Sequence, residues 1–553
     1  MGKLLIKNGL VYDPLNEISE EKKDILIEDG KIIEKFSSQD DIKEIDASGK
    51  TVIPAAIDIH SHIASQQVNW ARLLGSKNEN FAKIWNRLTL ENIARDYLAE
   101  GYTFVIDANV YPSLSKQTLL DFSNLPVLDK GMLLNASNLW ALEDEFQRGK
   151  IEELSYFLSD LLSTCKGFGI KVYNPFEAET WNFKLLRENI EKGGKLYNFS
   201  ALDVYKNLTR AAEHLNLPHS VHAHIEGYES QIAKKNLNII LKNINFSEIE
   251  RKNQDSKLRN QVFHIAHGNS LNMDGDNSEL IDFLNSNILV DMDLGFVGFN
   301  ELNPLITSDR RLINDLLSSS GNDAKVIRSA NETEGDSFVS FRMFDKKNKN
   351  HCMMWANAIE LALKVKNKWQ IQLSFNYPNY SNVKDLPKIM TWLISKKARD
   401  SYMKDMNGDF LSQSSLNENS EILSFNDFIT ITRASPAKSL GLSNIKGSFS
   451  LGSDGDVNIL NIDLSNIDLS KDYEKLEKAL KDIEYVIKGG DIIKKGENIN
   501  LMSEGKIFWT NREIDTEEKK KIMKKKKEFY QKYYSTFYDS LKTSLNEDLL
   551  REV

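Results

Sequence analysis

The stretch TVIPAAIDIHSH, residues 51–62, decides the fold that this sequence predicts. An apolar run from Val52 to Ile57 leads into Asp58-Ile59-His60-Ser61-His62, which is typical of a buried strand that ends in a polar turn. Because side chains alternate along a strand, His60 and His62 should point to the same side. If the strand belongs to a (β/α)₈ barrel, that side lies at the mouth of the barrel, where active sites form. Two neighbouring imidazoles there suit a divalent metal, although an isolated pair is more often a satisfied core or surface pair.

Strand-like runs alternate with helical stretches through the middle of the chain. The runs are TFVID (103–107), KGMLLN (130–135), FGIKVY (168–173), HSVHAH (219–224), QVFHIAH (261–267), NILVDM (287–292), KVIRS (325–329) and QIQLSF (370–375). Such alternation is typical of parallel βα units, and the stretch is long enough for a barrel with insertions. We therefore predict an α/β fold whose main domain, residues 56–424, is a TIM-like barrel.

Short β-like runs punctuated by glycine turns occur at both ends of the chain. They cover residues 3–12, 24–35, 43–53, 451–463 and 485–497. Turns such as Asn8-Gly9 and Asp29-Gly30 are typical of hairpins. The simplest arrangement is one β-sandwich subdomain built from both termini, with residues 1–55 and 425–510 as its two parts.

Residues 511–553 are predicted to form a helical tail. This tail carries a basic run, Lys519–Lys527, and then the aromatic residues Phe529, Tyr530, Tyr533, Tyr534 and Phe537. An arm that binds nucleic acid is conceivable. The helical spacing of the aromatic residues favours a terminal helix packed on the body or on a partner protein, because a single charge run is usually a solvated face.

Composition argues against several classes of protein. The 553 residues carry a formal net charge of -9, so no overall basic field attracts nucleic acid. The two cysteines cannot build a disulfide framework, which fits a reducing cytosol. The start of the chain lacks the apolar core of a signal peptide, and no apolar run approaches the ~20 residues that span a bilayer. We expect a cytoplasmic protein that is not bound to a membrane.

The histidines are concentrated in the predicted strands. Six of the nine form three pairs in strand-like runs, namely His60/His62, His222/His224 and His264/His267. Lys171 lies near the end of a fourth run. A buried lysine is costly to keep charged, and its neutral amine can react with carbon dioxide to give a carbamate that bridges two metal ions. The alternative is a lysine that extends to the rim of the barrel, and these residues leave both possibilities open.

The order HxH, Lys, His, His resembles the amidohydrolase superfamily. More specifically, the chain resembles the A subunits of formylmethanofuran dehydrogenase and of the bacterial formyltransferase/hydrolase complex of one-carbon metabolism. The resemblance spans roughly residues 3–463 and leaves out the basic-aromatic tail. Its matching stretches are IDIHSHIASQQVNWARLL (57–74), LPVLDKGMLLNAS (125–137), GIKVYNP (169–175), LPHSVHAH (217–224), WANAIEL (355–361), YPN (377–379), IMTWLISKKAR (389–399) and ITRASPAKSLGL (431–442).

The resemblance implies a centre of two zinc ions bridged by a carboxylated lysine. Transferred by motif, His60 and His62 would bind one ion, His224 and His264 the other, and Lys171 would be the bridge. The implied reaction hydrolyses an N-formyl amine, carried by a formylated aminomethylfuran, to formate and free amine. The implied partners are the other subunits of such a complex.

One departure from the family pattern falls on the last barrel strand. The family carries a catalytic Asp just before His-Pro-Asn, whereas this chain reads Asn376-Tyr377-Pro378-Asn379. Asn376 can offer a carbonyl oxygen to a metal, but it has no accessible pKa and cannot act as a carboxylate base. Another group, such as His222, His267 or Glu226, would then move the proton, or a shifted strand would bring in Asp385 or Glu226.

Two other functions stay open at this point. The chain could be a catalytically impaired structural subunit of the same complex, because Asn376 replaces the acid/base. It could also be a cyclic-amide amidohydrolase related to dihydroorotase. The second alternative is disfavoured because IASQQVNWARLL and the ISKKAR region match the formyl-carrier group.

Overall fold

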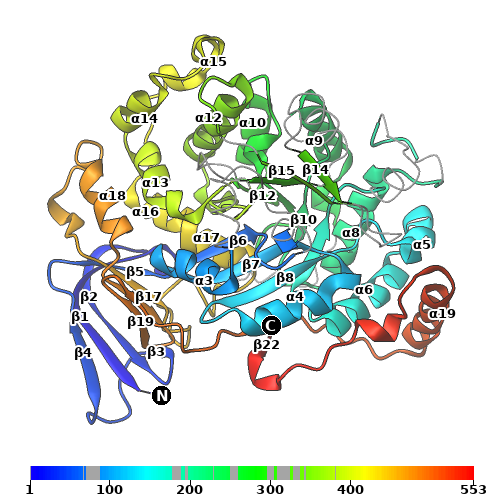
Figure 1. Cartoon of the computed structure of the whole chain (residues 1–553), viewed down its shortest axis with the longest axis horizontal. Helices are drawn as coiled ribbons and strands as arrows, with labels where there is room; N and C mark the ends of the chain where they lie inside the picture. The colour runs from blue at the N-terminus through cyan, green and yellow to red at the C-terminus, as the bar shows by residue number, and fades with distance from the viewer. Residues whose placement is uncertain are drawn as a thin grey trace.

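A computed structural model describes the backbone and side chains of most of the chain. The described residues are 2–65, 68–69, 88–176, 189–193, 197–227, 230–249, 259–295, 344–379 and 381–553, with the backbone alone of 304–307, 324–327 and 337–341. Eight parallel strands form the barrel at the centre of the molecule (Figure 1). They are β6 (Ala56–Ser61), β7 (Tyr102–Val110), β8 (Asp129–Asn135), β9 (Gly169–Val172), β10 (Val221–Ala223), β11 (Phe263–Ile265), β12 (Val290–Asp293) and β16 (Ile371–Gln372).

Two backbone hydrogen bonds join the last barrel strand to the first. The amide of Asn376 donates to the carbonyl oxygen of His60, and the amide of His62 donates to the carbonyl oxygen of Tyr377. The donor–acceptor distance is 2.8 Å in both bonds. These bonds connect the segment after β16 to the end of β6 and close the barrel. Closure places the first and last strands of the barrel side by side. The predicted HxH strand therefore lies next to the segment after β16, which carries Asn376.

One run predicted as part of the barrel series lies elsewhere. Residues 324–327 form β14 (Ala324–Ile327), which pairs antiparallel with β15 (Ser337–Phe341), and β15 also pairs with β13 (Pro304–Thr307). The rest of the predicted run, 328–329, lies outside the described residues. The prediction for KVIRS was wrong because a barrel closed by β16 and β6 has no free edge for another strand.

The longer helices are amphipathic, and several begin at a residue whose side chain caps the helix N-terminus. Helix α8, for example, begins with a capping box in which Ser200 and Asp203 satisfy each other's backbone amides. The longer helices are α3 (Leu90–Ala99), α4 (Ser115–Asn124), α6 (Ile151–Cys165), α8 (Ala201–His214), α9 (Gln231–Asn243), α10 (Ser278–Ser286), α12 (Lys349–Lys364), α13 (Leu386–Ile394), α14 (Lys396–Met403) and α18 (Tyr473–Lys481). The shorter helices are α5 (Glu143–Arg148), α15 (Gly408–Gln413), α16 (Phe425–Ile429) and α17 (Ser435–Ser439).

A nine-stranded sheet built from both ends of the chain forms the subdomain beside the barrel (Figure 1). Its strands are β1 (Lys3–Asp13), β2 (Ile18–Glu28), β3 (Lys31–Ile33), β4 (Ile42–Asp46), β5 (Thr51–Pro54), β17 (Val457–Leu460), β18 (Tyr485–Lys488), β19 (Asp491–Lys495) and β20 (Asn498–Ile499). The two segments meet where β5 pairs antiparallel with β17. The predicted fold class, a TIM-like barrel with a β-rich subdomain from both termini, is confirmed, while the predicted domain boundaries stay predictions.

The C-terminal segment returns to the barrel and packs on it. Strand β21 (Ile507–Trp509) pairs with the start of β8, and β22 (Leu550–Glu552) pairs with β21. Between them, helix α19 (Glu517–Tyr533) packs against α6 (Figure 1). The Tyr530 and Tyr538 side chains are buried, and the Tyr538 ring lies 5.7 Å from that of Phe157 in α6. In the part of the chain that the structure describes, no helix has the length and apolar character needed to cross a bilayer.

Candidate metal centre

Strand register places four ionisable side chains at one level of the barrel. Lys171 pairs with His222, His222 with His264, and His264 with Asp291 across neighbouring parallel strands. Residues paired in this way point to the same face of the sheet, and all four side chains are buried. The register therefore assembles a polar layer inside the barrel.

The carboxylate of Asp293, at the end of β12, lies where the imidazoles converge. Its Oδ2 oxygen is 3.0 Å from Nδ1 of His60, 3.0 Å from Nε2 of His264 and 3.5 Å from Nε2 of His222. Its Oδ1 oxygen accepts hydrogen bonds from the backbone amide of His267 at 3.0 Å and from Oγ of Ser374 at 2.7 Å. Two donors thus hold one carboxylate oxygen and leave the other aimed at ring nitrogens.

The remaining histidines surround this point. Nε2 of His222 is 3.1 Å from Nδ1 of His60, and Nδ1 of His224 is 2.8 Å from Nε2 of His267. The rings of His62 and His267 each lie 5.4 Å from the ring of His60. All six histidines of the three predicted pairs therefore gather in one buried cavity at the ends of β6, β10 and β11.

Burial keeps most of these imidazoles neutral. It lowers the pKa of His60 and of His62 to about 3, and it holds the pKa of His222, His224 and His267 well below the ordinary value. The neutral imidazole is the form that binds a metal ion. The centre is therefore ready to accept a cation without first releasing protons from these five rings.

His264 differs from its neighbours because it lies between two carboxylates. Burial alone would lower its pKa, but Asp291 and Asp293 outweigh that effect and raise the pKa to about 9. Nδ1 of His264 lies 2.9 Å from Asp291, so this carboxylate can keep the proton on Nδ1 and leave Nε2 directed at Asp293. A carboxylate that holds the far nitrogen of a histidine is typical of metal sites, where it fixes the tautomer and the orientation of the ring.

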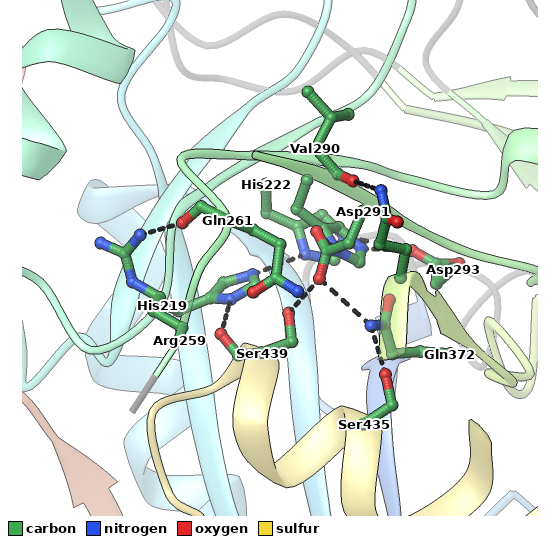
Figure 2. A network of polar contacts seen from close by, with 12 residues as sticks. His219, His222, Arg259, Gln261, Val290, Asp291, Asp293, Gln372, Ser435 and Ser439 are labelled. Atoms are coloured by element: carbon green, nitrogen blue, oxygen red, sulfur yellow. Dashed lines mark hydrogen bonds and ion pairs between the residues drawn. The ribbon is translucent and has the colours of Figure 1, made fainter. Parts of the chain in front are cut away.

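A polar network links the floor of this cavity to helix α17 (Figure 2). Asp291 Oδ2 accepts hydrogen bonds from Ser439 Oγ at 2.7 Å and from Gln372 Nε2 at 3.1 Å. His219 lies behind His222, with its Nε2 atom 3.2 Å from His222 Nδ1 and its Nδ1 atom 2.8 Å from the Ser439 carbonyl oxygen. The helix at residues 435–439 thereby supports the orientation of two histidines in the cavity.

Lys171 belongs to the same cavity. Its side chain is buried, and burial lowers its pKa to about 7, although Asp293 and Asp107 oppose the shift. Lys171 pairs with His222 across β9 and β10, so its side chain leaves the sheet on the same face as that histidine. An amine with this pKa is about half neutral at pH 7, and the neutral amine is the form that reacts with carbon dioxide.

Asn376 lies at the edge of the cavity beside His62, and its carboxamide opposes the lowering of the His62 pKa that burial causes. Its Nδ2 atom donates to the carbonyl oxygen of Asn379 at 3.0 Å. Its Oδ1 oxygen is buried and accepts no hydrogen bond of normal geometry from the described residues. The hydroxyl of the next residue, Tyr377, donates a hydrogen bond to the Asp96 carboxylate at 2.8 Å. Asp385, the alternative carboxylate, lies in a short helix, Val383–Asp385, and its charge partner is Lys388.

The donor set fits a divalent metal ion. His60, His222 and Asp293 offer ligand atoms that lie within 4.8 Å of one another, and His219, His222 and His264 form a second group that meets the same limit. Neutral imidazoles together with a carboxylate are typical ligands of zinc. A buried carbonyl oxygen without a donor, on Asn376, adds a further possible ligand.

A third cluster of possible ligands does not fit a cation. Carboxylate oxygens of Asp129, Asp454 and Asp456 also lie within 4.8 Å of one another. The ammonium of Lys446 already lies 2.7, 2.8 and 2.6 Å from their carboxylate oxygens. This ammonium occupies the place that a cation would take, and Lys31, Lys488 and Arg551 pair with the same acidic group.

Comparison with known proteins identifies the family. Residues 354–494 match the model of the Amidohydrolase family. Protein FwdA of Methanocaldococcus jannaschii is 30% identical over 553 residues, which cover 96% of this chain and 95% of that protein. The chain belongs to the FwdA family. The A subunit of the formyltransferase/hydrolase complex Fhc of Methylorubrum extorquens is 24% identical over 515 residues, covering 88% of this chain and 89% of that protein.

A solved structure similar to this FwdA-family chain supports the fold. It is the crystal structure of the formyltransferase/hydrolase complex FhcABCD from Methylorubrum extorquens in complex with methylofuran. One chain of that structure superimposes with a TM-score of 0.85 at 21% identity, covering 100% of this chain and 99% of that chain. At this level of identity the similarity establishes the arrangement of barrel and subdomain.

The structure brings together the site residues that the sequence predicted for this FwdA-family chain. His60, His62, Lys171, His224 and His264 are in the cavity, and Asn376 is at its edge; their assignment as ligands or catalytic groups stays a prediction. Sequence analysis missed Asp293, Asp291 and His219, and it gave no ligand role to His222 and His267. A signal for Asp293 was present, because the sequence VDMD, residues 290–293, ends a predicted strand in a carboxylate.

Proposed function

We propose that this FwdA-family chain is a metal-dependent hydrolase that cleaves the formamide bond of a formylated aminomethylfuran. The observation that carries the proposal is the convergence of ring nitrogens from His60, His222 and His264 on one oxygen of Asp293, inside the mouth of the barrel. The family supplies the substrate class. Its relative in Methylorubrum extorquens is named for a formyltransferase/hydrolase complex, and the similar solved complex contains methylofuran.

Two zinc ions are the proposed cofactor. His60 and His62 would hold one ion, His224 and His264 the other, and Lys171 as a carbamate would contact both. Bound zinc lowers the pKa of a water molecule toward 7 and polarises a carbonyl oxygen. The lowered pKa of Lys171, about 7, supports the carbamate because it makes the neutral amine available.

The residues around the ligands orient them for this reaction. Asp291 holds Nδ1 of His264, and Ser270 Oγ lies 2.9 Å from Nδ1 of His267. Hydrolysis adds the oxygen of one water molecule to the formyl carbon and breaks the C–N bond, and a proton must then reach the amine nitrogen. Asn376 cannot carry that proton, because a carboxamide has no suitable pKa. We therefore expect slow hydrolysis by the chain as it stands.

The chain is further proposed to act as one component of a larger complex. The support is its family and the exposed aromatic side chains of the tail. Phe537 is 63% exposed and Tyr533 is 47% exposed, whereas Tyr530 and Tyr538 pack on the body. The partners would be the other subunits of a formyltransferase/hydrolase or formylmethanofuran dehydrogenase complex, together with the formylated carrier.

Formate release from N-formylfurfurylamine, measured next to the zinc content of the purified protein, tests this function. The protein with zinc should release formate slowly, and both the chelated protein and the double variant His60→Ala/His62→Ala should release none. His214→Ala, which removes a histidine of α8 outside the cavity, is the matched control and should behave as wild type. Full zinc content without any formate release would overturn the catalytic proposal in favour of a structural role in the complex.

A further inference from the structure

We propose that Asp293 supplies the anionic metal ligand that the last barrel strand lacks because it carries Asn376. The inference rests on the proposed metal centre but not on the proposed substrate. It adds a ligand from β12 to a centre whose carboxylate would otherwise come from the segment after β16.

The first argument is geometric. Oδ2 of Asp293 lies within 3.0–3.5 Å of ring nitrogens from three strands, His60 of β6, His222 of β10 and His264 of β11. A cation placed among these nitrogens would therefore have the Asp293 oxygen in its coordination sphere. Oδ1 is held by the His267 amide and by Ser374, so the carboxylate cannot turn away without the loss of two hydrogen bonds in a buried site.

The second argument comes from a comparison with two other buried carboxylates of the barrel, Asp58 and Asp291. Both oxygens of Asp58 accept hydrogen bonds, from the His60 amide at 3.1 Å and from the Tyr97 hydroxyl at 2.7 Å. Both oxygens of Asp291 are likewise engaged, with His264 on one side and with Gln372 and Ser439 on the other. Of these three carboxylates, Asp293 is the one that directs an oxygen at the nitrogens that would bind a metal.

The third argument is electrostatic. Two divalent cations in a buried cavity need compensating negative charge, because an unpaired buried charge is costly. Imidazoles bound to a metal ion bring no negative charge, a carbamate on Lys171 would provide a single negative charge, and the Asn376 carboxamide provides none. Asp293 would supply a further negative charge at the point where the three ring nitrogens converge.

The fourth argument is the position of Asp293 next to the altered strand. Asp293 pairs with Gln372 of β16, and Ser374, two residues before Asn376, donates a hydrogen bond to Asp293. Moving the carboxylate from the last strand to the strand beside it shifts the negative charge by one strand while keeping it inside the same cavity. The exchange explains how a chain with an amide at residue 376 can retain a metal centre.

Metal retention tests the inference without any use of catalysis. Wild type and variants of the full chain are stripped with a chelator, reconstituted with zinc and bicarbonate and dialysed, and their zinc content is measured by mass spectrometry. Asp293→Asn should weaken zinc retention by at least about tenfold, since even residues outside the ligand shell contribute 10–100-fold to metal affinity. Asp385→Asn, which alters a half-buried carboxylate in the short helix Val383–Asp385, is the matched control and should retain zinc as wild type does.

Two further variants keep the test decisive. Asn376→Asp in the Asp293→Asn background should restore zinc retention, because it returns a carboxylate to the last strand. If Asp293→Asn does not fold, as judged by circular dichroism, Asp293→Glu with cobalt in place of zinc should shift the visible absorption bands of the metal. Undiminished zinc retention in folded Asp293→Asn, or an unchanged cobalt spectrum in Asp293→Glu, would overturn the inference. A wild type that binds zinc through Asp293 but releases no formate would overturn the proposed function alone.

Discussion

The backbone amide of Asn376 donates a hydrogen bond to the carbonyl oxygen of His60, 2.8 Å away. This bond ties the segment after β16, where the predicted catalytic position lies, to the end of the strand that carries the HxH pair. It places the Asn376 carboxamide beside His62, and Asn376 adopts a left-handed backbone conformation, φ 51°, to do so. The predicted replacement of Asp by Asn would therefore change the chemistry at a position that the closure of the barrel holds beside His62.

Asn376→Asp should raise the hydrolysis of a formyl amine by about tenfold or more. A carboxylate at this position can accept a proton and deliver it to the amine, and a positioned acid/base contributes typically 10²–10⁴ in rate. Formate release by wild type and variant is compared, with the zinc content of each determined in parallel. Full wild-type activity that the substitution leaves unchanged would show that proton transfer runs through another residue.

Metal uptake by the chelated protein should depend on dissolved carbon dioxide through Lys171. The neutral amine that burial favours at this position would form the bridging carbamate, so reconstitution without bicarbonate should leave the centre short of metal. Lys171→Met should bind less zinc than wild type and should show no response to bicarbonate. Zinc content after reconstitution with and without bicarbonate measures both effects.

A second buried lysine provides the control for that experiment. Lys130, at the start of β8, also has its pKa lowered to about 7 by burial, but its Nζ atom donates to the carbonyl oxygens of Leu125 and Gly505 at 3.1 and 3.0 Å. Lys130→Met should keep the bicarbonate-dependent uptake of zinc. A loss of that response in Lys130→Met, with Lys171→Met unaffected, would contradict the role given to Lys171.

Lys130 also predicts a pH dependence of stability. Its pKa is about 7 in the folded chain and near 10.5 when unfolded, so between these values the unfolded chain binds the extra proton. The free energy of unfolding of wild type should therefore rise with pH relative to Lys130→Met, by at most about 1.4 kcal/mol per pH unit. Melting temperatures of both proteins between pH 7 and pH 9 check the sign, and a gap that moves the opposite way would refute it.

Lys446→Met should strongly destabilise the chain. This buried ammonium contacts Asp129 of the barrel and also Asp454 and Asp456 in the segment that leads into β17. Removal of one partner from a buried ion cluster leaves unpaired charge, at a cost of about 3–5 kcal/mol. Chemical unfolding measures the loss. Lys471→Met, which breaks the exposed pair with Asp468, should leave the unfolding transition unchanged.

The same cluster should make the protein sensitive to acid. Burial alone would raise the pKa of Asp129 and of Asp454, but Lys446 holds both below the ordinary value. A depressed carboxylate pKa stabilises the fold above about pH 4, and this stabilisation is lost as the pH falls through the folded value. Lys446→Met should therefore lose less stability than wild type on acidification, and an equal loss in both proteins would rule out this role of the cluster.

Substitution of the exposed aromatic residues of the tail should weaken the association with partner proteins. Tyr533 and Phe537 face away from the body, so the double variant Tyr533→Ser/Phe537→Ser should fold normally and lose partners on affinity purification from the native host. Leu451→Ser, at a residue 66% exposed in the subdomain, is the control for a general loss of apolar surface. Equal recovery of partners with all three proteins would remove the tail from the interface.

Local patterns in the sequence were enough to predict the type of fold and to indicate that the paired histidines and Lys171 come together. The HxH strand, the paired histidines of the later strands and Lys171 could be placed at one barrel mouth, because a parallel barrel brings the carboxyl ends of its strands together. The glycine-punctuated strands at both ends likewise indicated a shared subdomain. Both inferences depend on the two-residue period of a strand, which sequence reveals directly.

Tertiary structure alone decided which strands close the barrel and which atoms meet. KVIRS has the apolar residues expected of a barrel strand, but its described part pairs in a separate three-stranded sheet. Strand pairing depends on partners that are far away in the sequence, so local residues alone do not decide it. In the same way, the contact of Asp293 with His60 joins residues 233 positions apart in sequence, and His222 rather than His224 lies nearest to that carboxylate. A one-residue change of register would turn these side chains out of the cavity, and the forces that set the register are the packing of the whole barrel and its closure at Asn376.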